Sequence, residues 1–189
     1  MTAYGFWLPN DPRGSWSDFI AGWELLKFGK ATTVRTRRSL AHEPHQYKRR
    51  MQAKNSLKHP PVSLTGKQAK YVAQGFDQYL KRHDLIVTAC AILPEHTHLV
   101  VLRDYNITAE RIANGLKSSA TRRLKKEGIH PFESIASSVG KYPTMCARGC
   151  WKVFLNSEFA IHRANRYVEN NPLREGKKRQ YWSFVRSFR

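Results

Sequence analysis

The chain has 189 residues, enough for one domain with a sizeable core, and its 41% apolar and 12% aromatic content excludes a disordered protein. Lysine and arginine number 33 against 14 acidic residues, and the net charge of +19 predicts a polyanionic partner, of which nucleic acid is the commonest. No apolar run approaches the roughly 20 residues of a membrane span. The first residues also lack the basic start and apolar core of a secretory signal. We therefore expect a single cytoplasmic domain over residues 1–189 with no membrane partner.

The first third of the chain is predicted to hold little regular structure. Residues 3–8 (AYGFWL) have the composition of a strand, which two prolines and a glycine then interrupt. Residues 30–62 are basic and polar, and we expect them to form a loop insertion that carries Arg49 and Arg50. Helical spacing of apolar residues begins at residues 65–83, where a threonine at the start can cap the first turn.

The middle of the chain predicts two strands and a second helix. Residues 85–93 and 96–102 are apolar on both faces, as in strands at the centre of a covered sheet, and a turn at residues 94–95 separates them. A helix over residues 108–126 follows, and a glycine can end it. The polar face of this helix carries five cations: Lys117, Arg122, Arg123, Lys125 and Lys126.

The last third is predicted to contain one further helix. Residues 130–150 are loop-rich, and residues 150–154 (CWKVF) suit a short strand or turn. A helix is expected over residues 157–170, with Pro172 ending it, and a basic aromatic tail over about residues 175–189. The order of elements predicts an α+β fold in which helices pack on an antiparallel sheet.

Two histidines stand one residue apart in the second predicted strand. Side chains at alternate strand positions share a face, so His96 and His98 lie side by side, while Thr97, Leu99 and Val101 face the other way. Two neutral imidazoles can hold a metal ion. The alternative is a pair of partly buried histidines satisfied by hydrogen bonds. In a strongly basic protein, a metal brought to a polyanion indicates phosphodiester chemistry.

The last predicted helix offers a nucleophile for that chemistry. An apolar stripe that includes Val168 is expected to face the sheet, while Arg163, Tyr167 and Asn170 form a separate stripe at i, i+4 and i+7. Tyr167 is a candidate nucleophile, and the neighbouring arginine would favour its phenolate form. The alternative is an amphipathic tyrosine at the edge of the core.

The three cysteines leave one more alternative open. An odd, low count argues against a disulfide scaffold, and Cys90 lies in an apolar strand. Cys146 and Cys150 form a CxxxC that could complete a zinc site with the two histidines. That alternative predicts a zinc-stabilised RNA-binding protein.

Three stretches together resemble a known family. They are YGFWLPNDPRG at residues 4–14, LPEHTHLVV at residues 93–101 and RYVENNPLREG at residues 166–176. These look like the signatures of the single-tyrosine HUH transposases, and in particular of the REP-associated tyrosine transposases. The likeness runs in order from Tyr4 to about Phe184. Two departures are Thr97, where the family has a bulky apolar residue, and Glu95, where close relatives often have asparagine.

The resemblance implies a fold and a set of site residues. The fold would be a ferredoxin-like antiparallel sheet with packed helices. Tyr167 would be the nucleophile, and His96 and His98 would bind Mg²⁺ or Mn²⁺. The family often has a further polar ligand four residues after the tyrosine, which here is Asn171, with Asn170 as the alternative.

The resemblance also implies a reaction and a partner. Single-stranded DNA carrying hairpins, such as REP-like repeats, would be cleaved through a 5′-phosphotyrosine and then rejoined by a monomer or homodimer. DNA binding would associate the protein with the nucleoid. A hairpin-binding protein without cleavage is the alternative. Eight cations would contact DNA: Arg163, Lys117, Arg122, Arg123, Lys125, Lys126, Arg49 and Arg50.

Overall fold

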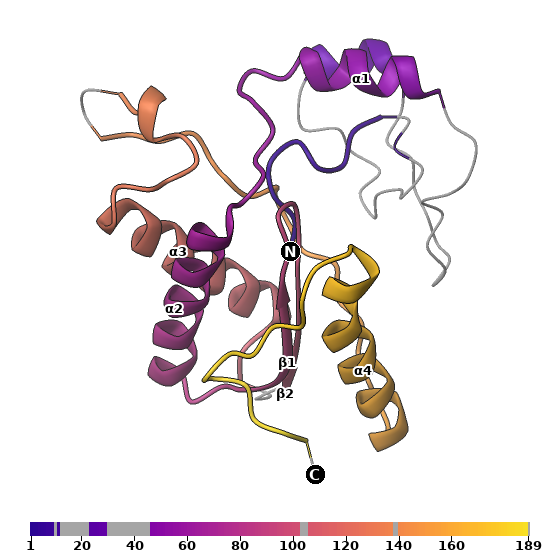
Figure 1. Ribbon diagram of the computed structural model, residues 1–189, viewed down its shortest axis with the longest axis vertical. Coiled ribbons are helices and arrows are strands. Elements are labelled where there is room, and N and C mark those ends of the chain that lie inside the picture. Colours follow the sequence, from indigo (N-terminus) through magenta and orange to yellow (C-terminus); the bar gives the residue numbers. More distant parts are fainter. Residues whose placement is uncertain (10, 12–22, 30–45, 103–105, 138–139, 189) are drawn as a thin grey trace.

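The computed structural model describes residues 1–9, 11, 23–29, 46–102, 106–137 and 140–188. Its architecture is α+β, as expected, with helices on both faces of an antiparallel pair of strands (Figure 1). The strands are β1 (Ile86–Ile92) and β2 (Thr97–Leu102). Helices α2 (Gly66–Arg82) and α3 (Ala109–Lys126) cover one face, and α4 (Glu158–Arg174) covers the other. None of the described helices is long and apolar enough to cross a membrane.

Both predicted helices of the middle region form, because each begins at a side-chain cap. The Thr65 hydroxyl accepts a hydrogen bond from the Gln68 backbone N–H, and the Gln68 side chain accepts one from the Thr65 N–H. Thr108 caps α3 in the same way by accepting from the Arg111 N–H. Each cap satisfies N–H groups that lack a partner within the helix.

Helices α2 and α3 pack against each other at close range. A Cβ atom added at Gly75 would lie 2.8 Å from the Ala120 Cα atom, so only glycine allows this approach. At Gly115 an added Cβ atom would lie 2.1 Å from the Tyr79 ring. The two glycines therefore set the distance between the helices, and that distance fixes how α3 stands on the sheet.

Strand β1 is buried on both faces, as predicted, whereas in β2 only Thr97 and Val100 are buried and the other four residues are half-buried. Val87, Cys90 and Ile92 of β1 join the core beneath α2 and α3, whereas Ala89 and Ala91 pack toward α4. A register irregularity between residues 87 and 89 interrupts the alternation of faces.

A buried hydrogen bond fixes α4 on its side of the sheet. The Thr88 hydroxyl donates to the Asn165 Oδ1 atom over 2.8 Å, and both residues are buried. Val168 packs against Ala89, Ala91 and Val100 one helical turn further on. These contacts set both the position and the rotation of α4.

Three further segments extend the strand pair. Thr2 forms an antiparallel bridge to His96, and Ala3 forms one to Cys146. On the other edge, Val185 forms a parallel bridge to Val87. The strand predicted over residues 3–8 does not form, because the chain turns at Gly5, whose φ of +77° suits glycine.

A glutamine of the C-terminal tail completes the outer edge of β1. The Gln180 side chain accepts a hydrogen bond from the Ile92 N–H and donates one to the Ile92 carbonyl, each over 2.7 Å. The Arg186 N–H donates to the Val87 carbonyl over 2.9 Å. The tail therefore occupies part of an edge that a neighbouring strand would otherwise pair with.

The prediction of a loop throughout residues 30–62 is wrong for residues 47–55. These form helix α1 (Tyr47–Asn55), while residues 30–45 lie outside the described part of the chain. Most residues of the sequence YKRRMQAKN are good helix formers, but the loop was predicted from the basic and polar character of the region. Ala53 is fully buried against the short 3-10 helix η1 (Trp23–Phe28) in a second small core.

The last third holds two corrections, of which the first is that residues 150–154 form neither the short strand nor the turn that was predicted. The Ser157 hydroxyl caps α4 by accepting from the Ala160 N–H. The prediction that Pro172 ends this helix is wrong, because α4 continues to Arg174. A proline in the last turn removes one hydrogen bond only, and Pro172 is fully buried. The loop-rich region before α4 includes one short 3-10 helix, η2 (Glu133–Ile135).

Candidate functional site

The two histidines lie side by side at the start of β2. The ring centroids of His96 and His98 are 4.9 Å apart, and the ring planes are nearly perpendicular at 82°. The Phe6 ring lies 5.1 Å from the His96 ring and walls the pair on one side. The strand periodicity therefore places both imidazoles together, as the sequence predicted.

Tyr167 of α4 lies over the histidine pair. Its ring centroid is 5.6 Å from that of His98, with the planes at 86°. Tyr167 remains 43% exposed, so its ring contacts His98 while part of its surface stays open to solvent. Because Val168 and Asn165 anchor α4 to the sheet, the position of Tyr167 follows from packing within the same chain.

Arg174 is the cation that stacks on this tyrosine. Its guanidinium carbon lies 5.2 Å from the Tyr167 ring centroid. Arg163, which the sequence analysis assigned to the tyrosine and to DNA, lies over the Phe159 ring at 5.6 Å. Tyr167 and Arg174 are seven residues apart, which places them on one helix face, so their contact could have been predicted from the sequence.

Glu175 is a second residue that sequence reasoning missed. Its Oε1 atom lies 3.6 Å from the Nε2 atom of His96. Glu175 follows Asn171 by four residues and Tyr167 by eight, so all three return to one face of α4 and its C-terminal cap. This spacing of four residues can be read from the sequence, but Glu175 was not considered because Pro172 was expected to end the helix.

The two asparagines proposed as metal ligands have different surroundings. Asn171 stays on the helical path and is buried, with 6% of its surface exposed. Asn170 accepts a hydrogen bond at its Oδ1 atom from Arg179 of the tail over 2.9 Å. Asn170 is therefore already engaged, which favours Asn171 of the two.

The chemistry of the pair suits a divalent metal. Burial lowers the pKa of His98 to about 3, with the charges of His96 and the N-terminal amine adding to the effect. The imidazole of His98 is thus neutral at neutral pH and keeps a lone pair for a ligand. Two imidazoles with an amide form a mixed nitrogen and oxygen donor set that Mn²⁺ accepts.

The zinc site considered from the sequence is not assembled. Among the described residues, no three side chains of histidine, cysteine, aspartate or glutamate are close enough together to hold a metal ion. Cys146 and Cys150 are free thiols, and burial raises the pKa of the Cys146 thiol. A metal at His96 and His98 would therefore need Asn171, water or substrate to complete its coordination.

The cations assigned to DNA fall into separate groups. Arg49 bonds to Gln46 over 3.2 Å on α1, and Arg50 lies 3.9 Å from Asp11. On α3, Arg123 pairs with Glu127 over 3.0 Å, and its guanidinium lies over the Tyr71 ring of α2. The remaining α3 cations are Lys117, Arg122, Lys125 and Lys126.

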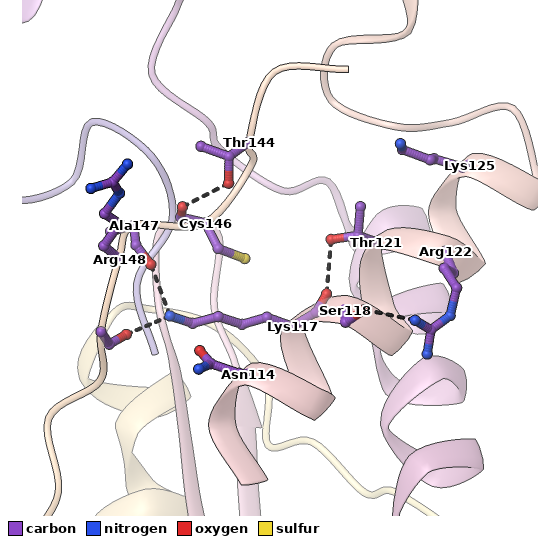
Figure 2. Close-up of a pocket in the computed structure, with 11 residues that line it drawn as sticks. Asn114, Lys117, Ser118, Thr121, Arg122, Lys125, Thr144, Cys146, Ala147 and Arg148 are labelled. Atoms are coloured by element: carbon purple, nitrogen blue, oxygen red, sulfur yellow. Dashed lines mark hydrogen bonds between the residues drawn. The ribbon is translucent and has the colours of Figure 1, made fainter. Parts of the chain in front are cut away.

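Three of those α3 cations line an open pocket of about 610 Å³ between α3 and residues 144–149 (Figure 2). Hereafter this is the basic pocket. Its lining residues are Asn114, Lys117, Ser118, Thr121, Arg122, Lys125, Thr144, Cys146, Ala147, Arg148 and Gly149. Arg148 adds a fourth cation that the sequence analysis did not consider. Lys126 is exposed and lies outside the lining.

Comparisons of the chain with models of known protein families, with curated proteins and with solved structures found no match. Its function is therefore inferred from the residues above.

Proposed function

We propose that the protein cleaves single-stranded DNA beside hairpins and rejoins the ends, as do the single-tyrosine HUH transposases that it resembles. One observation carries the proposal. The Tyr167 ring lies 5.6 Å from His98, whose ring lies 4.9 Å from His96. A nucleophile and a metal-binding pair from distant parts of the sequence thus meet at a partly exposed surface.

The order of segments across the sheet supports the ferredoxin-like fold that belongs to this proposal. Residues 1–3, β1, β2 and residues 145–147 are the first to fourth segments along the chain. Backbone bridges order them fourth, first, third, second, and neighbours run antiparallel. Helix α2 connects the first two segments, and α3 connects the last two, on one face. A strand–helix–strand–strand–helix–strand sequence with this order is the ferredoxin-like arrangement.

In the proposed reaction, a phosphodiester bond of the DNA is exchanged for an ester bond between the phosphate and Tyr167. The Tyr167 hydroxyl loses its proton as its oxygen attacks the scissile phosphorus, the bond to the 3′-oxygen breaks, and that oxygen takes up a proton, so no net proton is gained or lost. The product is a 5′-phosphotyrosine and a free 3′-hydroxyl. Because the covalent link retains the bond energy, the 3′-hydroxyl of another DNA end can reverse the step and join the strands.

The surrounding side chains have distinct parts in that reaction. Arg174 stacks on the Tyr167 ring and helps to hold it at the site. Glu175 contacts His96 and orients its ring, while burial keeps His98 neutral at neutral pH. A divalent cation held by the histidine pair, with Asn171 as a further donor, would neutralise charge on the non-bridging phosphate oxygens. Mn²⁺ tolerates nitrogen ligands better than Mg²⁺ does.

A labelled oligonucleotide tests this proposal. Single-stranded DNA carrying hairpins from the region flanking the gene is incubated with the protein and Mn²⁺, and protein–DNA adducts that survive denaturant are counted. We expect an adduct with the wild type and none with Tyr167→Phe. Tyr181→Phe is the matched control, because Tyr181 is 86% exposed and lies in the tail. An adduct that persists in Tyr167→Phe would disprove the assignment of the nucleophile.

A hairpin-binding protein without cleavage is the second candidate. It is favoured because, among the described residues, no three histidine, cysteine, aspartate or glutamate side chains are placed to hold one metal ion. The same oligonucleotides separate the two, since this candidate predicts binding to hairpins without an adduct at any concentration of Mn²⁺ or Mg²⁺.

A further inference from the structure

We propose that the basic pocket is a clamp for the sugar–phosphate backbone of a nucleic-acid strand, formed by Arg122, Lys125 and Arg148 and held open by Lys117. The assignment of DNA as the strand rests on the proposed function, whereas the pocket itself does not use Tyr167 or the histidines.

The lining of the basic pocket suits a phosphodiester. Four cations enter it, and no carboxylate is among the described residues that line it. Ser118 adds a hydroxyl group and Asn114 an amide, whereas the hydroxyls of Thr121 and Thr144 already donate to the Lys117 and Cys146 carbonyls. Cations with hydroxyl and amide groups are the side chains that contact phosphate and sugar oxygens. The net charge of +19 gives the whole molecule the same preference.

The basic pocket is unsuited to reading bases. Its described lining residues include no aromatic ring on which a base could stack. Lys125 does contact a ring, since its Nζ atom lies 4.3 Å from the Tyr142 ring centroid, but Tyr142 lies outside the lining. Contacts here would therefore hold a strand irrespective of its sequence.

The charge of Lys117 suggests a phosphate contact, but its ammonium group instead binds backbone carbonyls. Its Nζ atom donates to the Ala147 carbonyl over 2.8 Å and also to the Gly149 carbonyl, as Figure 2 shows. Two carbonyls on either side of Arg148 are thereby fixed to α3. Lys117 is a positioning residue, which holds Arg148 at the rim opposite Arg122.

The two arginines are available at that rim. Arg148 and Arg122 are both exposed. Arg122 donates to the Ser118 hydroxyl over 2.7 Å, four residues earlier on the same helix, which orders the guanidinium without neutralising it. A strand that crosses the basic pocket would meet Arg122 on α3 and Arg148 on the opposite wall.

Salt-dependent binding tests the clamp. The probe is a fluorescein-labelled DNA oligonucleotide with a hairpin stem and a single-stranded flank, followed by fluorescence anisotropy across a range of salt concentrations. We expect Arg122→Gln/Arg148→Gln to weaken binding at least about tenfold and to make the slope of log affinity against log salt shallower by about two. A second oligonucleotide of unrelated sequence should lose affinity equally.

A charge-matched control separates a clamp from general attraction. Lys67→Gln/Lys70→Gln removes the same charge from exposed positions on α2 outside the basic pocket. We expect this variant to lose less than about threefold in affinity. Equal losses in the two double variants, or no loss in the pocket variant, would overturn the clamp.

A double-mutant cycle tests the positioning role. Lys117→Met removes the two hydrogen bonds but keeps the length of the side chain. If Lys117 acts through Arg148, Lys117→Met/Arg148→Gln should bind no more weakly than the weaker single variant, and Lys117→Arg should restore part of the affinity. Additive losses would show that the lysine contacts DNA itself. Thermal melting of each variant checks that it folds.

The outcomes distinguish this inference from the proposed function. Arg122→Gln/Arg148→Gln should still form the Tyr167 adduct at saturating protein concentration, and Tyr167→Phe should bind with the wild-type salt slope. If neither the wild type nor any variant forms an adduct, but Arg122→Gln/Arg148→Gln still weakens DNA binding, the proposed cleavage is refuted and the clamp is not. A normal adduct with no pocket effect would refute the clamp alone.

Discussion

The two faces of the sheet carry different kinds of site. On the α4 face, aromatic rings meet at 4.9 Å and 5.6 Å, and a buried hydrogen bond between Thr88 and Asn165 fixes the helix that carries Tyr167. On the α3 face, long cations line an open pocket. A bond-making step depends on the position of its atoms to a fraction of an ångström, whereas attraction between charges acts over several ångströms.

This difference explains how each site is built. The residues of the α4 face come from the start of β2, where His96 precedes the strand and His98 is its second residue, from the middle of α4 and from its C-terminal cap, and packing holds them. The cations of the α3 face extend from one helix and one irregular segment. Damage to packing should therefore harm chemistry more than binding, and removal of charge should do the reverse.

The largest expected effect comes from the histidine pair. His98→Ala should reduce metal-dependent cleavage at least about 100-fold, because half of the proposed metal-binding pair is lost, while hairpin binding stays within about threefold. Cleavage is followed on gels across a Mn²⁺ titration. His162→Ala is the control, since His162 also lies on α4 but packs on Phe188. Full cleavage by His98→Ala would remove the histidines from the mechanism.

The anchor of α4 should come next. Asn165→Leu leaves the buried Thr88 hydroxyl without its acceptor, so it should lower the free energy of unfolding by about 1–3 kcal/mol. Because α4 would shift on the sheet, cleavage should fall at temperatures where the variant is folded, and the salt slope of binding should not change. Denaturant titration and anisotropy together check this. A parallel loss of both activities would show that the two faces are not independent.

Glu175 should have a smaller effect on the same face. Glu175→Gln keeps the shape of the side chain and removes its charge, so we expect cleavage to fall about tenfold with little change in stability. The Mn²⁺ concentration for half-maximal cleavage should rise. Glu169→Gln, an exposed position on α4, is the control. Unchanged Mn²⁺ dependence would mean that Glu175 does not orient the histidine.

The smallest expected effect lies beside the α3 face and concerns acid stability. Burial lowers the pKa of His130 to about 4 from its ordinary value of 6.5, with the charge of Lys125 contributing and Glu133 opposing. Between these pH values the unfolded chain binds more protons than the folded one, so stability falls as pH falls from about 6.5 to about 4. His130→Asn should flatten that part of the curve. A curve of unchanged shape in denaturant titrations would show that other groups cause the acid sensitivity.

Much of the helix and strand pattern could be predicted, because its determinants are local. Thr65, Thr108 and Ser157 mark helix starts in the sequence and do so in the structure. The common face of His96 and His98 follows from strand periodicity alone. Spacing on one helix likewise separated Tyr167 from the apolar stripe.

What could not be predicted depends on contacts between distant segments. The bridges from Thr2 and Ala3 join three separated parts of the chain, and no local pattern encodes them. Lys117 looked like the other cations of α3, yet backbone carbonyls some 30 residues away decide its part. The position of Glu175 could not be predicted, because it depends on α4 continuing past Pro172, and that depends on the burial of this proline.

One measurement tests the central claim most directly. The protein–DNA adduct formed with Mn²⁺ and a hairpin oligonucleotide is digested with trypsin, and the peptide that carries nucleotide mass is sequenced by mass spectrometry. We predict that the modified peptide is residues 167–174, which cleavage after Arg166 and Arg174 releases, with the nucleotide on Tyr167. Nucleotide mass on any other tyrosine, or the absence of an adduct with every hairpin bound by the protein, would contradict the account.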